Sequence, residues 1–203
     1  MNKLSVLVLT RNEERNIVEC LKSVTWAGEV IVIDALSADR TVELARPYAT
    51  QIRQNRWPGY AEQRRYALGC ASYPWVLFLD ADERVTPALR EEIQGVLAQE
   101  RPLDGYYVPR KAYFLGKWIQ NCGWWPNYVL RLFKKNRASI SPDSVHERVI
   151  VEGETGYLQH PLLHYSYQSL EQYLAKFNQY TSLEADDMAK AGRKFSVDEL
   201  IHE

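Results

Sequence analysis

The first hundred residues alternate between short runs of consecutive apolar residues and stretches with apolar residues at helical spacing. Such runs are typical of strands buried on both faces of a sheet, and the amphipathic stretches are typical of covering helices. One helix is expected around the apolar stripe of Ile17, Leu21 and Val24. Strands are expected over residues 4–9, 30–34, 51–54 and 75–79, and further helices over residues 41–49, 59–71 and 86–97. This order predicts an α/β fold with a mostly parallel sheet and right-handed crossovers.

After Pro102 the pattern becomes more aromatic and less regular. Strands are expected over residues 106–108 and 128–133, and a long helix is expected between Ser169 and Gly192. We interpret the chain as one domain covering residues 1–203. Its expected parts are residues 1–100, residues 101–168, and C-terminal helices over residues 169–203.

Composition and charge narrow the range of functions. The chain is 46% apolar and 25% charged, as in ordinary globular proteins, and its net charge of −1 gives no reason to expect a nucleic-acid partner. No run of 18 apolar residues is present, so no membrane-spanning helix is expected. The three widely spaced cysteines indicate a reducing compartment, and a cytoplasmic location is therefore expected.

Carboxylates follow the apolar runs at the points where parallel strands should end. Asp80, Asp82 and Glu83 follow the fourth run, and Asp34 closes the second. Ligands of open α/β sheets bind at the carboxyl ends of the strands, so we expect these side chains to gather at one rim. Two hard oxygen ligands side by side suit Mg²⁺ or Mn²⁺ on a diphosphate. The alternative is a solvated loop that opens the next helix at Thr86.

Two other features belong to the same expected rim, and each has an ordinary alternative. Thr10 and Glu13 have the spacing of a helix capping box, but they also follow the first strand. Arg64, on the helix before the fourth strand, either contacts a base or phosphate or faces solvent. Taken together with Ser37 and the strand-end carboxylates, these positions favour a nucleotide site.

Three stretches of the chain resemble family 2 glycosyltransferases, which have the GT-A fold. These stretches are residues 7–14, 32–41 and 77–83. Within that family, the chain looks most like the bacterial lipopolysaccharide inner-core β-1,4-glucosyltransferases, through residues 59–64, 130–133 and 145–148. The resemblance implies a Rossmann-like, mostly parallel sheet flanked by helices, with a mixed-sheet half on the acceptor side. One departure is Ala35-Leu36, where relatives usually carry small polar residues or Gly.

The resemblance also implies an activity. It is the metal-dependent, inverting transfer of a hexose, expected to be glucose from UDP-glucose, to a hydroxyl of a lipopolysaccharide-core or related glycan. By this analogy Asp34 recognises the nucleoside, Asp80 lies against the ribose or the metal, and Asp82 binds Mg²⁺ or Mn²⁺. The expected nucleotide-sugar site comprises Thr10, Arg11, Asn12, Glu13, Asp34, Ser37, Arg64, Asp80, Ala81 and Asp82.

The second half supplies candidates for the remaining roles. Glu147 is the candidate catalytic base, with Asp143 as the alternative base and an ion pair with Arg148 or Arg131 as the ordinary reading. By analogy with some GT-A enzymes, His164 completes the metal site; otherwise it is structural. The candidate acceptor-binding residues are Trp124, Trp125, Arg131 and His146, with core packing as the alternative for the tryptophans.

Two other functions remain open from the residues. A sugar-nucleotide nucleotidyltransferase would also carry strand-end carboxylates, but it usually needs a Gly-rich first loop, and residues 9–13 contain no Gly. A non-catalytic module that binds nucleotide sugars or carbohydrates would need no base.

The last residues carry one more signal. Residues 196–199 have a capping-box pattern only four residues before the final one. We expect the chain to be a shortened form of relatives that continue into an apolar, basic segment, peripheral to the inner face of the membrane.

Overall fold

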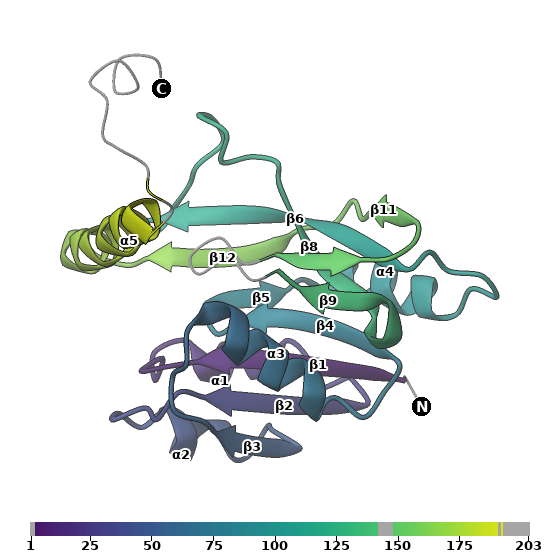
Figure 1. Cartoon of the computed structure of the whole chain (residues 1–203). Coiled ribbons are helices and arrows are strands. Elements are labelled where there is room, and N and C mark those ends of the chain that lie inside the picture. The colour runs from purple at the N-terminus through teal and green to yellow at the C-terminus, as the bar shows by residue number, and fades with distance from the viewer. Residues whose placement is uncertain (1–2, 142–147, 191, 193–203) are drawn as a thin grey trace.

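A computed structural model describes residues 3–141, 148–190 and 192. Four strands from the first part of the chain lie parallel in the order β3-β2-β1-β4 (Figure 1). They are β1 (Leu4–Thr10), β2 (Glu29–Asp34), β3 (Gln51–Gln54) and β4 (Trp75–Asp80). In the central strands almost every side chain is buried, as expected for a sheet covered on both faces.

The second part of the chain extends this sheet with mixed pairing. The order continues β4-β8-β6-β12-β5, with β7 and β11 also paired to β6, which makes ten strands. The added strands are β5 (Glu83–Val85), β6 (Gly105–Phe114), β7 (Lys117–Trp118), β8 (Asn127–Lys134), β11 (Thr155–Tyr157) and β12 (Leu162–Tyr167). A short 3-10 helix, η1 (Lys135–Arg137), leads into a separate ribbon of β9 (Ala138–Ile140) and β10 (Val149–Val151).

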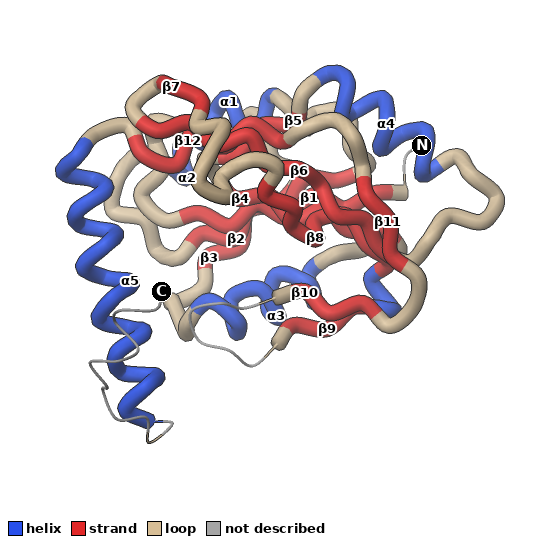
Figure 2. Tube along the Cα trace, turned by 90° about the horizontal axis from the view of Figure 1, so that it is seen from above, coloured by secondary structure: helices blue, strands red, loops and turns tan. Residues whose placement is uncertain are grey.

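Helices cover the two faces of the sheet unequally (Figure 2). Side chains of α1 (Ile17–Lys22), α2 (Thr41–Ala45) and α4 (Pro87–Leu97) pack in one core cluster with alternate residues of β1 and β2. Side chains of α3 (Tyr60–Cys70) and of β9 pack in a second cluster on the other face, with Leu7, Ile31 and Phe78. The period of two along each strand therefore divides the core between the faces.

The long helix α5 (Leu170–Lys190) lies on the side of the sheet toward which β1, β2 and β12 run (Figures 1 and 2). Its first turn is capped by Ser169, whose Oγ accepts a hydrogen bond from the Gln172 amide at 3.2 Å. The helix thus starts where β12 ends and passes the rim at which strand-end side chains gather.

The fold confirms the predicted α/β class and the order of elements in the first hundred residues. Three local expectations were wrong. No capping box forms between Thr10 and Glu13, because the Glu13 amide donates to Thr41 Oγ1 at 2.7 Å and α1 begins only at Ile17. The second helix ends at Ala45, short of the expected residue 49. Residues 83–85 form an edge strand, β5, where a loop was expected.

Two expectations concern the membrane and the end of the chain. Within the described residues, no helix combines the length and apolarity needed to cross a membrane. The capping signal at residues 196–199 lies outside the described residues.

Candidate functional site at the strand ends

The loops that follow β1 and β2 are tied to each other. The Asn12 amide donates to Ser37 Oγ at 2.8 Å, and Asn12 Oδ1 accepts from the Ala38 amide at 2.8 Å. Asn12 and Leu36 both have positive φ angles, 55° and 56°, which non-glycine residues adopt only when their surroundings require it. The expected nucleoside-binding loop is thus a cross-braced pair of turns. Arg11 is exposed on it.

Asp34 is fully buried at the end of β2. Its carboxylate accepts hydrogen bonds from the Ser37 amide at 3.0 Å, from the Ser37 hydroxyl, and from Gln54 Nε2 at 3.1 Å. One carboxylate therefore holds the β2 loop against β3, and Gln54 has a role that the sequence pattern did not indicate. Thr10 is also buried, and its Oγ1 has no hydrogen-bond partner within the described part of the chain.

Asp80 closes β4 between two guanidinium groups. Arg64, from α3, approaches its Oδ1 at 3.2 Å, and Arg131, from β8, donates to its Oδ2. Burial by itself would raise the pKa of Asp80, but Arg131 and Arg64 hold that pKa far below its ordinary value. Asp80 is therefore ionised at any physiological pH. Arg64 Cζ also lies 5.2 Å from the centre of the Phe78 ring, over its face, which is a cation–π contact.

Glu83 was expected at the rim with Asp80 and Asp82, but it is fully buried behind the rim. It accepts from Arg131 Nη2 at 2.8 Å, lies 3.7 Å from Arg110 Nη1, and accepts from the Asp80 amide at 3.0 Å. Glu83 and Arg131 thus form a buried charged layer beneath Asp80. Arg131, an expected acceptor residue, is 7% exposed at its side chain and faces this layer. Only strand β5, which the sequence did not predict, turns Glu83 inward.

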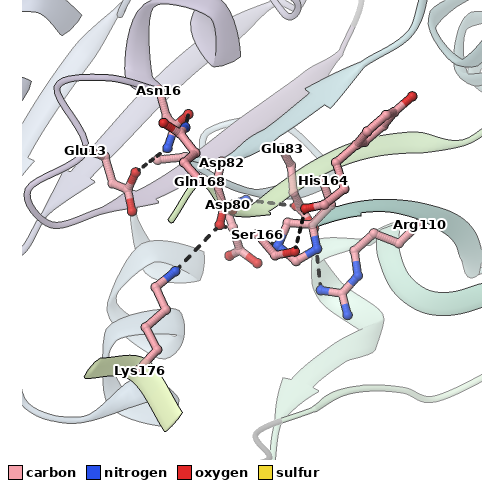
Figure 3. A network of polar contacts seen from close by, with 12 residues as sticks. Glu13, Asn16, Asp80, Asp82, Glu83, Arg110, His164, Ser166, Gln168 and Lys176 are labelled. Atoms are coloured by element: carbon pink, nitrogen blue, oxygen red, sulfur yellow. Dashed lines mark hydrogen bonds and ion pairs between the residues drawn. The ribbon is translucent and has the colours of Figure 1, made fainter. Parts of the chain in front are cut away.

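Asp82 and His164 meet at the rim (Figure 3). His164, on β12, pairs in register with Glu83 of β5, and its Nε2 lies 3.4 Å from Asp82 Oδ2. The Tyr165 amide donates to the Asp82 carbonyl at 2.9 Å, which fixes the two strands at this point. Burial alone would raise the pKa of Asp82, but His164 and Lys176 bring it below its ordinary value.

Ala81 and Glu13 complete the inner rim. Ala81 is buried and its carbonyl accepts from Arg84 Nη1 at 2.9 Å. Glu13 accepts from Asn16 Nδ2 at 2.8 Å. Burial raises the pKa of Glu13 above its ordinary value, although the hydrogen bond from Asn16 opposes the rise. A hollow of about 170 Å³ runs along this loop and is closed by two glutamines near the start of α5.

A divalent ion at this rim would need ligands from the strand-end carboxylates or from His164. Within the described residues, no cluster of three or more His, Cys, Asp or Glu side chains could hold a metal ion. Asp82 and His164 nevertheless present one carboxylate oxygen and one imidazole nitrogen 3.4 Å apart. Mg²⁺ is commonly held by one or two protein ligands together with substrate phosphates, so this pair fits an ion that arrives with a diphosphate.

The two expected acceptor tryptophans pack against other aromatic residues. Trp124 packs edge-on against Phe114 at 6.3 Å, and Trp125 packs edge-on against Trp118 at 5.6 Å. Both expected acceptor tryptophans are half-buried. The remaining second-half candidates, Asp143, His146 and Glu147, lie outside the described residues.

The parallel α/β sheet with carboxylates at its strand ends, extended by a mixed half, is the architecture expected of the GT-A class of glycosyltransferase folds. The model of glycosyl transferase family 2 matches residues 5–151. The chain therefore belongs to glycosyl transferase family 2.

Two relatives match almost the whole chain. It is 32% identical over 211 residues to the lipopolysaccharide core biosynthesis glycosyltransferase LpsC of Rhizobium meliloti, covering 98% of this chain and 76% of LpsC. It is also 32% identical over 209 residues to an uncharacterized glycosyltransferase of Rickettsia typhi, covering 97% of this chain and 71% of the relative. The chain thus spans about three quarters of the length of these relatives.

Solved structures share the fold at lower identity. S. aureus TarS 1-349 in complex with UDP-GlcNAc has a TM-score of 0.61 at 18% identity, covering 83% of this chain and 59% of that chain. Glucosyl-3-phosphoglycerate synthase from Mycobacterium tuberculosis, in complex with Mn²⁺, UDP and glucosyl-3-phosphoglycerate, has a TM-score of 0.59 at 17% identity. It covers 95% of this chain and 81% of the synthase. At these identities the likeness shows the GT-A fold.

Proposed function

We propose that this protein transfers a hexose from a UDP-sugar, with UDP-glucose as the first candidate, to a hydroxyl group of a lipopolysaccharide-core glycan. The observation that carries the proposal is the meeting of Asp80, Asp82 and His164 at the strand ends of a family 2 fold. The acceptor class rests on the similarity to LpsC, whose name places it in lipopolysaccharide core biosynthesis. The same acceptor class leads us to propose that the protein acts in the cytoplasm, at the periphery of the membrane.

The donor would lie across the carboxyl ends of β1, β2 and β4. The loop braced by Asp34 and Ser37 would receive the nucleoside, and the Asp80 carboxylate, held by Arg64 and Arg131, would face the ribose. Asp82 and His164 would hold Mg²⁺ or Mn²⁺. When bound, the ion neutralises charge that builds up on the departing diphosphate.

The transfer itself is a single displacement that inverts the anomeric carbon. The acceptor oxygen forms a bond to that carbon as the bond to the diphosphate breaks, and a carboxylate takes the acceptor proton. We assign this base to Glu147, with Asp143 as the alternative. Glu147→Gln should lower kcat by roughly 10²–10⁴-fold while donor affinity is kept. A collapse of donor affinity instead would assign Glu147 to the donor site, and Asp143→Asn would then be measured.

The experiment that tests the function is a panel of nucleotide sugars incubated with the protein, a lipopolysaccharide-core acceptor and Mg²⁺ or Mn²⁺. Release of the nucleoside diphosphate that depends on the acceptor, with a mass increase of one hexose on the acceptor, is the expected result. Donor binding without release of the nucleoside diphosphate, whichever acceptor is present, would favour a non-catalytic binding module. Release of pyrophosphate from a nucleoside triphosphate and a sugar phosphate would favour a nucleotidyltransferase.

A further inference from the structure

One cation at the rim comes from outside the part of the chain that matches the family model. Lys176 lies on α5, beyond residue 151, and its side chain points from the helix toward Asp82 (Figure 3). Its Nζ is 3.9 Å from Asp82 Oδ2. The side chain is 31% exposed, so its ammonium group reaches both the buried carboxylate and the open rim.

The position of Lys176 is set by aromatic packing at the strand ends. On the preceding turn of α5, Tyr173 packs edge-on against Tyr167 at 5.1 Å and against Phe114 at 5.5 Å. The Lys176 ammonium itself lies 5.5 Å from the centre of the Tyr167 ring. A helix anchored one turn earlier on β6 and β12 presents this lysine to the rim, in contrast to a lysine that extends freely into solvent.

Two other cations at the rim, Arg131 and Arg64, are already committed to carboxylates. Arg131 donates to Asp80 and Glu83, and Arg64 lies against Asp80. Lys176 differs, because 3.9 Å is too long for a hydrogen bond and the contact with Asp82 is a loose ion pair. Its N–H donors therefore remain available to a ligand. An ammonium with free donors beside an acidic strand end is suited to phosphate oxygens.

We propose that Lys176 is a donor-binding residue that contacts the diphosphate of the nucleotide sugar. The inference rests on the proposed function, since it takes the ligand to be a nucleoside diphosphate. Without a ligand, Lys176 balances the charge of Asp82. When the diphosphate binds, Asp82 and His164 would hold a divalent ion beside it, and Lys176 would then contact the phosphate oxygens. The C-terminal helix thus forms a wall of the donor site.

The test is a calorimetric titration of the full chain with UDP, GDP and ADP, with Mg²⁺ present and with EDTA. The variants are Lys176→Met, which removes the charge, and Lys176→Arg, which keeps it. The matched control is Lys3→Met, an exposed lysine at the opposite end of β1 that removes the same charge. Affinity for the preferred nucleoside is measured in parallel by ligand-observed NMR, because the nucleoside lacks the phosphates.

We expect Lys176→Met to weaken binding of the preferred diphosphate by roughly 10–100-fold, the effect of losing a charge-assisted contact. Lys176→Arg should lose less than about 5-fold, and Lys3→Met should bind as the wild type does. Affinity for the nucleoside should be the same in all four proteins. Unchanged diphosphate binding in Lys176→Met would overturn the proposal. So would an equal loss for nucleoside and diphosphate, since Lys176 would then support the fold of the site.

The two proposals fail in different ways. Suppose that the wild type binds UDP and that Lys176→Met binds it more weakly as expected, but no sugar is transferred to any acceptor. The assignment of Lys176 then stands, and the proposed transfer is wrong. If sugar is transferred and Lys176→Met binds UDP as the wild type does, only the assignment of Lys176 is wrong. If the wild type binds no nucleoside diphosphate, both are wrong.

Discussion

The strand-end carboxylates have different environments although they are close in sequence. Asp80 is clamped by two arginines, and Glu83 is buried in a charged layer. Among the described residues, the Asp82 carboxylate has the looser contacts to His164 and Lys176. The least constrained carboxylate is the one best placed to exchange its partners for a metal ion. Donor binding and transfer are therefore expected to be most sensitive to substitution of Asp82.

Asp82→Asn replaces the carboxylate with a neutral amide of the same size. We expect Mg²⁺-dependent binding of UDP to be lost and transfer to slow by roughly 10²–10⁴-fold, because an amide is a poor ligand for a hard divalent ion. The free energy of unfolding should change by less than about 1 kcal/mol, because no volume is lost. Calorimetry and urea denaturation measure both. Glu43→Gln, at an exposed position on α2, removes the same charge and should be neutral.

Glu13 gives a prediction about pH. Its pKa is raised on folding, chiefly by burial, so the native state holds this proton more tightly than the unfolded state does. The resulting cost to stability is absent below the ordinary pKa of 4.5 and grows as pH rises through the folded pKa. Glu13→Gln keeps the contact with Asn16 but removes the titrating group. We expect the variant to have a higher Tm than the wild type at pH 7 and the same Tm near pH 4. A difference that is constant with pH would contradict this account.

At the scale of elements, β5 and β12 bring the second half of the chain to the donor rim. These strands pair antiparallel, and the register places His164 opposite Glu83, one residue beyond Asp82. Helix α5 follows β12 and carries Lys176 to the same rim. The site is therefore completed by elements that follow residue 151, where the match to the family model ends.

Thr86 links the start of α4 to the start of β12. As the N-cap of α4 its Oγ1 accepts from the Leu89 amide at 3.2 Å, and the same hydroxyl donates to the Pro161 carbonyl just before β12 at 3.1 Å. Thr86→Ala should lower the free energy of unfolding by about 1–2 kcal/mol, because it removes both the cap and the link. Urea denaturation measures this. Thr25→Ala, which removes an exposed hydroxyl bonded only to the Lys22 carbonyl, is the control and should cost less than about 0.5 kcal/mol.

At the scale of the whole molecule, one charged layer joins the parallel and mixed halves of the sheet. The layer of Glu83 and Arg131, from β5 and β8, is linked by ion pairs to Arg110 of β6 and to Asp80 of β4, which also pairs with Arg64 of α3. Because a buried ion pair is costly to separate, this layer fixes how the two halves meet beneath the site.

Arg131→Met tests this layer. The substitution leaves the fully buried Glu83 with Arg110, 3.7 Å away, as its remaining cationic partner among the described residues, and we expect a loss of about 3–5 kcal/mol in the free energy of unfolding. Adding Glu83→Gln removes the uncompensated charge, so the double variant should be more stable than Arg131→Met alone. Urea denaturation of the two single variants and the double variant gives the coupling. Additive losses would show that the two residues act independently.

Much of the first half could be predicted from local pattern. The strands ending at Thr10, Asp34 and Asp80 were predicted because residues buried on both faces leave a continuous apolar run, and a polar residue marks its end. That parallel strands gather their carboxyl ends at one rim is a rule of topology, so the meeting of the loop after Asp34 with the loop after Thr10 could also be predicted. Sequence motifs and the family match agree here.

The remaining features depend on contacts between residues far apart in the chain. Glu83 is inward-facing only because β5 pairs with β12, and Arg131 is buried only because β8 lies beside β4. Lys176 has no local signal at all, since an exposed helix and a helix that borders a site have the same polar residues. The sequence determines which chemical group each side chain carries. Which charges that group faces is decided only when the sheet forms, because burial and pairing set the electrostatic environment.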